Sequence, residues 1–284
     1  GLVNGKWLGE NGASSVVLAA RGGKVTPADG EKLKKIANCG FSVVKCDSAE
    51  LMDTARMVGA ILGGDAPLAG VWHAAGVLSD GLLRSQNAGT VKRVFAPKAF
   101  GGWALHASTL ASPLDACVLF SSIAALLGGT AQSNYAAANT TLDSLGGSRR
   151  TRGLIASSVQ WGPWAAIGMA ADESINARIQ AMGIGLIGLA EGTLTFQATL
   201  LPQAPSIVAL WMVKWSKFLG LMSEVPAQMS KFASRRVVDG AAAKTDGGGA
   251  KLVTLEMIQE TLKSTTGGDV DPDAPLMESG LDSL

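Results

Sequence analysis

Residues 117–145 read CVLFSSIAALLGGTAQSNYAAANTTLDSL, and this stretch decides the fold. It opens with a short apolar run that ends in two serines, which is typical of a strand buried on both faces. Small residues and two glycines follow, and a helical pattern then surrounds Tyr135. A buried strand followed by a helix is the repeating unit of a parallel sheet packed between helices.

The same alternation extends in both directions, from Ser15 to Trp161. The candidate strands are Ser15 to Ala20, Phe41 to Cys46, Gly70 to His73, Cys117 to Ser121 and Ile155 to Gln160. Helical spacing of apolar residues lies between them, at Thr26 to Asn38, Glu50 to Leu62 and Ala88 to Leu110. We therefore expect an α/β fold with a Rossmann-like, doubly wound parallel sheet flanked by helices.

The C-terminal part of the chain changes in composition. Helical stretches at Ile175 to Met182 and Gly192 to Leu201 precede a last apolar run, Ser206 to Val213. Residues 239–250 read DGAAAKTDGGGA, which cannot bury apolar surface and is typical of a flexible linker. An amphipathic helical pattern resumes from Lys251 to Lys263. We expect a domain over residues 1–235, a linker over 236–250 and a short helical fragment of a second domain over 251–284.

Composition excludes several classes of protein. The 284 residues carry 24 Lys plus Arg against 23 Asp plus Glu, so no net charge favours nucleic acid or an anionic membrane. Three cysteines and two histidines show neither zinc spacing nor a disulfide framework. No apolar run reaches the roughly 18 residues of a membrane span, and we expect no signal peptide from the sequence pattern. A cytoplasmic location is expected, with an organelle such as a plastid as the alternative.

Residues that follow the strands point to a dinucleotide, because parallel sheets bind ligands at the carboxyl ends of their strands. Arg21 follows the first strand and can pair with the 2′-phosphate of NADPH; alternatively it is an exposed loop arginine. Asp47 follows the second and can accept a hydrogen bond from the adenine amino group, or cap the next helix. After the third, Ala75 and Gly76 are small enough for the cofactor ribose to approach the backbone.

The start of the chain resembles the end of a glycine-rich turn. Gly1 would be its last glycine, and the helical pattern from Val3 to Glu10 would be the helix that it opens. The strand that should precede Ser15 is then missing, and most of the pyrophosphate cradle is expected before Gly1. Whether this chain binds the cofactor by itself is left open by this pattern.

One tyrosine stands in a distinctive context. Tyr135 follows Ser122 by 13 residues (135 − 122), and Asn139 follows Tyr135 by four. That spacing of four places the two side chains on one face of a helix.

A family resemblance rests on these motifs. The run FSSIAALLGGTAQSNYAAANTTLDSL, with VWHAAGVLSDGLL and APKAFGGWALH upstream and SSVQWGPW downstream, closely resembles the ketoreductase domain of polyketide synthases and of related fatty acid synthases. That domain belongs to the short-chain dehydrogenase/reductase superfamily, and the resemblance covers roughly Gly1 to Phe232. Ordinary members of the superfamily carry YxxxK. Here Asn139 takes the place of that lysine and Lys98 lies upstream, as if exchanged, which is similar to polyketide ketoreductases.

The resemblance implies NADPH-dependent reduction of a carrier-bound β-ketoacyl thioester to a β-hydroxyacyl thioester. Tyr135 would donate the proton, because hydride addition leaves negative charge on the carbonyl oxygen. Lys98 would lower the tyrosine pKa from about 10 and contact the nicotinamide ribose. Ser122 would position the carbonyl, and Asn139 would hold the lysine or a proton-relaying water. Taken singly, Ser122 and Asn139 are alternatively an ordinary cap or turn residue.

Two further features bear on this resemblance. Gly162-Pro163 resembles the segment that packs on the nicotinamide, so Pro163 is a further candidate for cofactor binding. In the family an LDD-type motif marks ketoreductases that give the D-configured alcohol. Leu78-Ser79-Asp80 retains its final acid, and Leu127 replaces the tryptophan that marks the opposite class. We therefore expect the D product.

The last residues, GLDSL, resemble the attachment motif of an acyl carrier protein. Ser283 would carry 4′-phosphopantetheine; alternatively the motif is a chance helix cap. Only the first helix and loop of a carrier would be present, so we expect that Ser283 of this chain is not modified. The expected partners are the carrier-tethered substrate and neighbouring synthase domains.

Two other functions stay open on the sequence. The chain is alternatively a non-catalytic scaffold that stabilises neighbouring synthase domains, or a free-standing short-chain dehydrogenase acting on small alcohols. The presence of all four candidate catalytic residues argues against the scaffold. Asn139 and the carrier motif argue against the free-standing enzyme.

Overall fold

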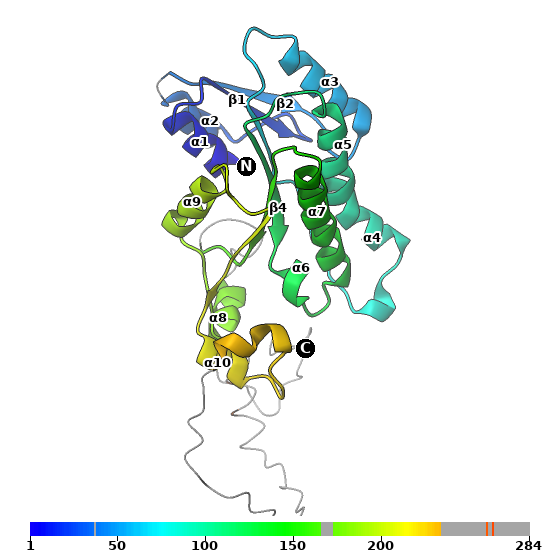
Figure 1. Ribbon diagram of the computed structural model, residues 1–284, viewed down its shortest axis with the longest axis vertical. Coiled ribbons are helices and arrows are strands. Elements are labelled where there is room, and N and C mark those ends of the chain that lie inside the picture. The colour runs from blue at the N-terminus through cyan, green and yellow to red at the C-terminus, as the bar shows by residue number, and fades with distance from the viewer. Residues whose placement is uncertain (37, 166–172, 234–259, 261–262, 264–284) are drawn as a thin grey trace, which may run out of the picture. The chain divides into compact units, whose positions relative to one another are not determined.

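The computed structural model describes residues 1–36, 38–165, 173–233, 260 and 263 (Figure 1). They fall into two compact units. Unit 1 comprises Gly1–Trp161 and Ala190–Leu210, and unit 2 comprises Gly162–Leu189 and the residues from Trp211 onward. The predicted linker and Ser283 lie outside the described residues, as does nearly all of the predicted carrier fragment.

Unit 1 is built on parallel strands. The first ladder pairs β1 (Ser15–Ala20) with β2 (Gly40–Lys45). The second has the order β3-β4-β5-β7, formed by Gly70–His73, Ala116–Ser122, Ser157–Trp161 and Ile207–Leu210. Every pairing in both ladders is parallel, and β5 is buried along its whole length. The predicted α/β class with a parallel sheet is confirmed.

The two ladders are separate. In the described residues β1 pairs only with β2, and β3 pairs only with β4, so each of these two strands has one edge without a ladder partner.

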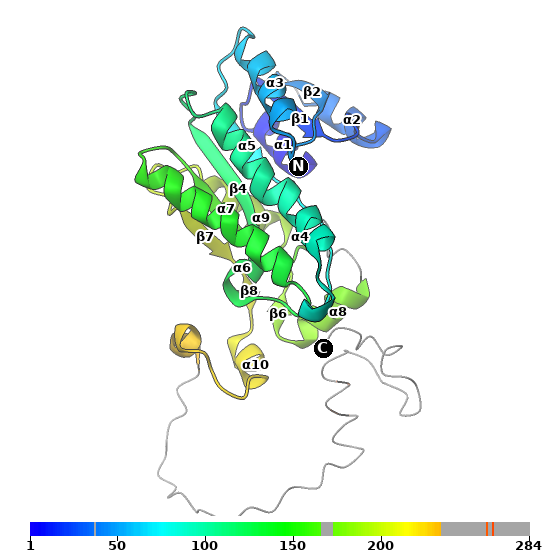
Figure 2. The ribbon, with the colours of Figure 1, turned by 90° about the vertical axis from the view of Figure 1, so that its right-hand side faces the viewer.

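Helices pack against the strands of unit 1. They are α1 (Leu2–Glu10), α2 (Pro27–Lys34), α3 (Leu51–Leu62), α4 (Ala88–Phe95), α5 (Gly101–Ser108), α6 (Ala124–Leu127), α7 (Ser133–Thr151) and α9 (Leu189–Ala198). α4, α5 and α7 lie together on one side of β4 (Figure 2). On the other side, the ring of Phe196 in α9 contacts those of Trp72 and Phe120.

Alternating side chains on β4 explain this two-sided packing. Leu119 belongs to a buried cluster with Leu142 and Leu145 of α7, whereas the neighbouring Phe120 faces α9, with 6.3 Å between its ring centroid and that of Phe196. Successive residues of a strand point to opposite faces of a sheet. A continuous apolar run therefore supplies the core on both sides.

The helix predicted over Ala88 to Leu110 is interrupted. Asn87 caps α4 with a capping box that involves Thr90, and α4 continues into a π-helical turn, η2 (Ala96–Phe100), before α5 begins. Pro97 lies in this turn and has no N–H to donate. Single π turns occur inside α-helices and frequently at functional sites. Here the turn carries Lys98.

Unit 2 is small and rich in aromatic side chains. It contains α8 (Glu173–Ala181), an antiparallel pair of β6 (Ile184–Gly185) with β8 (Met212–Val213), α10 (Trp215–Gly220) and η3 (Ala227–Phe232). Trp215 stacks on Phe232 at 4.1 Å between ring centroids. The run predicted over Ser206 to Val213 thus divides between β7 and β8. No helix among the described residues of either unit has the length and apolar character of a membrane span.

Candidate active site

Tyr135 lies in the first turn of α7, just after the loop that follows α6. Its side chain is buried, 8% exposed, in a cluster with Val94 of α4, Ala124 of α6 and Ala138 of α7. Three helices therefore fix the ring, and the phenol is held as part of the core. An acid in such a site loses little orientational freedom when it acts.

Lys98 approaches the same ring from η2. Its side chain is only 4% exposed. Nζ donates a hydrogen bond of 2.9 Å to the carbonyl of Phe120 in β4 and lies 5.4 Å from the centroid of the Tyr135 ring. An ammonium at this distance from an aromatic face interacts favourably with it.

Asn139 joins the helix to the strand. Its side chain is fully buried, Nδ2 donates to the carbonyl of Tyr135 at 2.8 Å, and its own carbonyl accepts from the hydroxyl of Ser121 at 3.3 Å. Its Oδ1 is buried with no hydrogen-bond partner in the part of the chain that the structure describes. That oxygen is an available acceptor for an ammonium or a water.

Ser122 ends β4 beside this group. Its hydroxyl oxygen accepts a hydrogen bond of 3.2 Å from the backbone N–H of Ala124, so it does cap the short helix α6. Hydrogen bonding between this side chain and Tyr135 lowers the tyrosine pKa, against the larger effect of burial, which raises it. The cap and the proximity to the tyrosine therefore occur together, and the structure brings all four predicted catalytic residues into one cluster.

Burial shifts the pKa values of both central groups of the cluster. It lowers the pKa of Lys98 to about 8, an effect that the charge of Asp143 opposes. It raises the pKa of Tyr135, against the hydrogen bonding of Ser122 and Asn139. The net shift of the tyrosine is therefore upward because burial is its largest cause, and the effect of Lys98 on the tyrosine pKa stays a prediction.

The loop after β3 contacts both parts of the site. A Cβ at Gly76 would lie 2.9 Å from Cε of Lys98, so this glycine is packed against the lysine side chain. Further along, Gln132 donates to the carboxylate of Asp80 at 2.9 Å, and Asn134 donates to the carbonyl of Ser79 at 2.8 Å. These bonds join the loop to the residues that lead into α7.

The remaining predicted cofactor residues are less tightly held. Arg21 is exposed where β1 ends, and Gly1 is the exposed N-cap of α1. Asp47 is half-buried, and its Oδ1 accepts from the N–H of Ala49 at 3.1 Å in the turn before α3. Ala75 is half-buried in the loop beside Gly76. Pro163 belongs to unit 2, where its carbonyl accepts a hydrogen bond from Ile187.

Two buried groups escaped the sequence analysis. The imidazole Nε2 of His73 lies 3.2 Å from the carbonyl of Lys98, and burial with the nearby Lys98 charge lowers the His73 pKa to about 4. Asp143 accepts hydrogen bonds from Ser158 and Gln160 of β5. The position of Asp143, four residues after Asn139, is a signal that could have found it, because that spacing repeats the face of α7.

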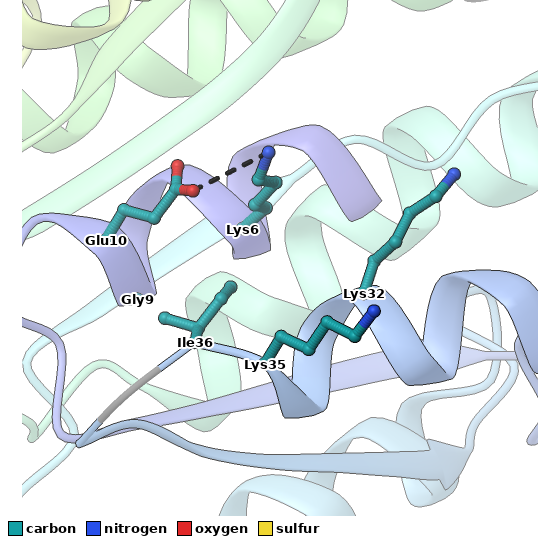
Figure 3. Close-up of a pocket in the computed structure, with 6 residues that line it drawn as sticks. All are labelled: Lys6, Gly9, Glu10, Lys32, Lys35 and Ile36. Carbon is teal, nitrogen blue, oxygen red and sulfur yellow. Dashed lines mark ion pairs between the residues drawn. The ribbon is translucent and has the colours of Figure 1, made fainter.

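A shallow hollow lies between α1 and α2, away from these residues in sequence (Figure 3). Its volume is about 540 Å³, and its lining residues are Lys6, Gly9, Glu10, Lys32, Lys35 and Ile36. Lys6 pairs with Glu10 at 3.5 Å across its rim. None of the predicted site residues lines it. Within the described residues, no group of His, Cys, Asp and Glu side chains is arranged to hold a metal ion.

Comparison with known proteins identifies the family. Residues 1–166 match the family described as KR domain. The phthioceranic/hydroxyphthioceranic acid synthase of Mycobacterium tuberculosis is 33% identical over an alignment that covers 100% of this chain and 14% of that protein. The chain thus spans about a seventh of the length of this curated relative.

Solved structures show the same relation. One described as the structure of A-type ketoreductases from a modular polyketide synthase is 32% identical, with a TM-score of 0.74 over 80% of this chain and 48% of that one. The PlmKR1 ketoreductase, from the first module of phoslactomycin biosynthesis in Streptomyces sp. HK803, is 29% identical, with a TM-score of 0.76 over 83% of this chain and 56% of that one. With its parallel sheet and its cluster around Tyr135, the chain belongs to the ketoreductase (KR) domain family of modular polyketide synthases.

Proposed function

We propose that this ketoreductase domain reduces a carrier-bound β-ketoacyl thioester to the β-hydroxyacyl thioester with NADPH. The observation that carries the proposal is the buried pair of Tyr135 and Lys98, with Nζ 5.4 Å from the ring centroid. Burying an ammonium destabilises the fold, and the lowering of the Lys98 pKa to about 8 reflects this cost. A purely structural domain has no need of such a group. A hydride-transfer site does need a charge there.

In this mechanism Tyr135 is the acid. Burial raises its pKa, so the resting site holds the phenol in its protonated form around neutral pH. The phenol gives its proton to the carbonyl oxygen as negative charge develops there. Lys98, largely protonated below its pKa of about 8, stabilises the negative charge that proton transfer leaves on the tyrosine. Ser122 donates to the same carbonyl oxygen and holds it near the phenol.

Asn139 supports the acid through the helix backbone. Its amide group fixes the first turn of α7 by donating to the Tyr135 carbonyl, and its Oδ1, which has no partner among the described residues, is an acceptor for a proton-relaying water or for the Lys98 ammonium. The four residues thus divide the work. One gives the proton, one supplies charge, one positions the carbonyl and one connects the site to a proton source.

The residues present fit NADPH in part. When bound, the cofactor supplies the hydride. A Cβ at Gly76 would lie 2.9 Å from Cε of Lys98 and would displace the end of the lysine side chain, so a glycine here keeps Lys98 in place. A residue without Cβ also suits a loop that a ribose must approach. The exposed guanidinium of Arg21 is accessible to a 2′-phosphate. Asp47, Ala75 and Gly1 complete the proposed cofactor set of unit 1, with Asp47 also holding the turn before α3. Pro163 belongs to unit 2, and its part in cofactor binding stays a prediction.

The substrate is proposed to arrive on an acyl carrier protein within a larger synthase, with neighbouring synthase domains as partners. The GLDSL motif supports this context, with Ser283 as the site of 4′-phosphopantetheine attachment in a complete carrier. The D-configured alcohol is the proposed product. Chiral chromatography of the product would determine that configuration.

The test is reduction of a β-ketoacyl N-acetylcysteamine thioester with NADPH, measured by cofactor oxidation and by mass spectrometry of the product. It is run on this chain and on a longer version that includes the preceding segment with the expected strand and glycine-rich turn. A product that gains two hydrogens supports the proposal. No product from either version, when both are folded, contradicts it and favours a non-catalytic scaffold.

A further inference from the structure

A buried carboxylate lies behind the proposed catalytic cluster. Asp143 of α7 is 6% exposed and is held by two side chains of β5. The hydroxyl of Ser158 donates to Oδ1 at 2.6 Å, and Nε2 of Gln160 donates to Oδ2 at 2.8 Å. Both donors are uncharged. They give each carboxylate oxygen one hydrogen bond but leave the negative charge in the core.

The sheet register connects this carboxylate with Lys98. Ser121 of β4 pairs with Gln160 of β5, and Phe120 pairs with Val159. Lys98 donates to the carbonyl of Phe120, one residue before Ser121 on β4. Asp143 accepts from Gln160, the neighbour of Ser121 across the ladder. The ammonium is therefore bonded to Phe120 of β4, and the carboxylate is bonded to the β5 residue that pairs with Ser121, the next residue of β4.

The helix supplies the same connection. Asp143 lies four residues after Asn139 and eight after Tyr135, which places all three on one face of α7. The hydroxyl of Ser121 donates to the carbonyl of Asn139. The face of the helix that carries the proposed acid also carries the anion.

The ion pairs on the surfaces of α1, α2 and α3 join only neighbouring side chains of one helix, so they do not neutralise either buried charge. A lone buried charge is strongly unfavourable, and an opposite charge in the same core offsets part of that penalty. Consistent with this, the charge of Asp143 raises the Lys98 pKa against the larger effect of burial.

We propose that Asp143 is a positioning residue of the reductase site, whose buried carboxylate keeps Lys98 in its ammonium form through the β4–β5 ladder. The inference rests on the proposed function, because it assigns Asp143 a role only where the charge of Lys98 is used. Other titratable groups around the two are His73 next to Lys98, Tyr135 on the same helix face, and Asp80 across the loop from the tyrosine. Burial, together with the charge of Lys98, lowers the pKa of His73 to about 4, so His73 is neutral over the working range.

The test replaces the carboxylate by its uncharged isostere, Asp143→Asn. The readout is the titration of Lys98 followed by the Cε resonance of isotope-labelled lysine, assigned as the signal that Lys98→Met removes. We expect a midpoint of about 8 in the wild type, and one about one pH unit lower in Asp143→Asn. The alkaline limb of kcat/KM should move to lower pH by a similar amount. Equal Lys98 midpoints in the two folded proteins would overturn the proposal.

A matched variant separates charge from structure. Ser158→Ala removes one hydrogen bond to Asp143 but leaves its charge, so the Lys98 midpoint should stay at the wild-type value. A shift of the same size in Ser158→Ala would mean that packing, and not the carboxylate charge, sets the lysine. The resonance titration needs no turnover. It therefore decides whether Asp143 sets the charge of Lys98 even if the chain proves to have no reductase activity, and a failure of this link is distinguishable from a failure of the proposed function.

Stability gives a second route if Asp143→Asn unfolds. In that case the double variant Asp143→Asn, Lys98→Met removes both charges together and should regain the folded state, with a higher denaturant midpoint than Asp143→Asn alone. A double variant that is no more stable than Asp143→Asn would contradict an electrostatic link between the two residues.

Discussion

The two ladders of unit 1 hold their proposed functional residues in different ways. Around the four-stranded ladder, Tyr135, Lys98 and Asn139 are buried, and each has a backbone or ring contact with another member of the group or with β4. At the end of the two-stranded ladder, Arg21 is exposed and Asp47 is held by its own turn. The residues proposed for chemistry thus lie where burial shifts pKa values, and the residues proposed for cofactor recognition are exposed or half-buried.

The largest expected effect on the difference between the two ladders comes from removing the buried charge of Lys98. The Lys98 pKa falls from its ordinary value of 10.5 to about 8 in the folded protein. Between these pH values the unfolded chain binds a proton that the folded protein has lost, so the free energy of unfolding rises with pH. Relative to Lys98→Met, the wild type should gain roughly 3 kcal/mol across this window.

This prediction is checked by denaturant unfolding of the wild type and Lys98→Met at a series of pH values. The matched control is Lys92→Met, which removes an exposed lysine of α4. A difference between wild type and Lys98→Met that stays constant from pH 8 to pH 10.5 would show that the lysine is not desolvated, and would remove the contrast between the two ladders.

A smaller effect is expected where the loop after β3 meets Lys98. Gly76→Ala would place a Cβ 2.9 Å from Cε of Lys98, so the lysine must shift. We expect kcat to fall about tenfold, the equivalent of a barrier higher by about 1.4 kcal/mol. Gly59→Ala in α3 is the control, since its Cβ meets nothing within 4 Å. Steady-state kinetics in which the two variants have equal kcat would show that Lys98 tolerates displacement.

The smallest effect on the fold is expected at the exposed end. Arg21→Gln removes a charge-assisted contact with the 2′-phosphate and should raise KM for NADPH about tenfold. Because Arg21 is solvent-exposed, the free energy of unfolding should change by less than about 0.5 kcal/mol. Arg84→Gln, at another exposed arginine, should leave KM unchanged. If Arg21→Gln binds NADPH as the wild type does, then Arg21 is only a loop arginine.

Much of the fold follows from sequence periodicity. The runs Ser15 to Ala20 and Gly70 to His73 are strands over the predicted residues. The strand predicted over Phe41 to Cys46 begins and ends one residue earlier, as β2. The predicted long helix is interrupted by a π turn at Pro97. This turn could not be predicted from periodicity, because it depends on how the backbone adjusts to the missing N–H donor of proline.

The site is less predictable from sequence than the fold. Spacing places Tyr135 and Asn139 on one helix face, whereas Lys98 and Ser122 come from family resemblance. The sign of the Tyr135 pKa shift does not follow from sequence because burial, its largest cause, is a property of the packed helices. The role of Asp143 could not be predicted from the sequence, because its hydrogen-bond partners Ser158 and Gln160 come from a strand about 15 residues away.

The most direct test of the proposed chemistry is the rate of NADPH oxidation by Tyr135→Phe with a β-ketoacyl thioester, compared with the wild type. The change removes only the hydroxyl and leaves the ring in its cluster with Val94, Ala124 and Ala138. We predict a loss of about 10²–10⁴-fold in kcat, with the thermal midpoint nearly unchanged. A folded Tyr135→Phe protein that reduces the thioester at the wild-type rate would contradict the assignment of this residue as the acid.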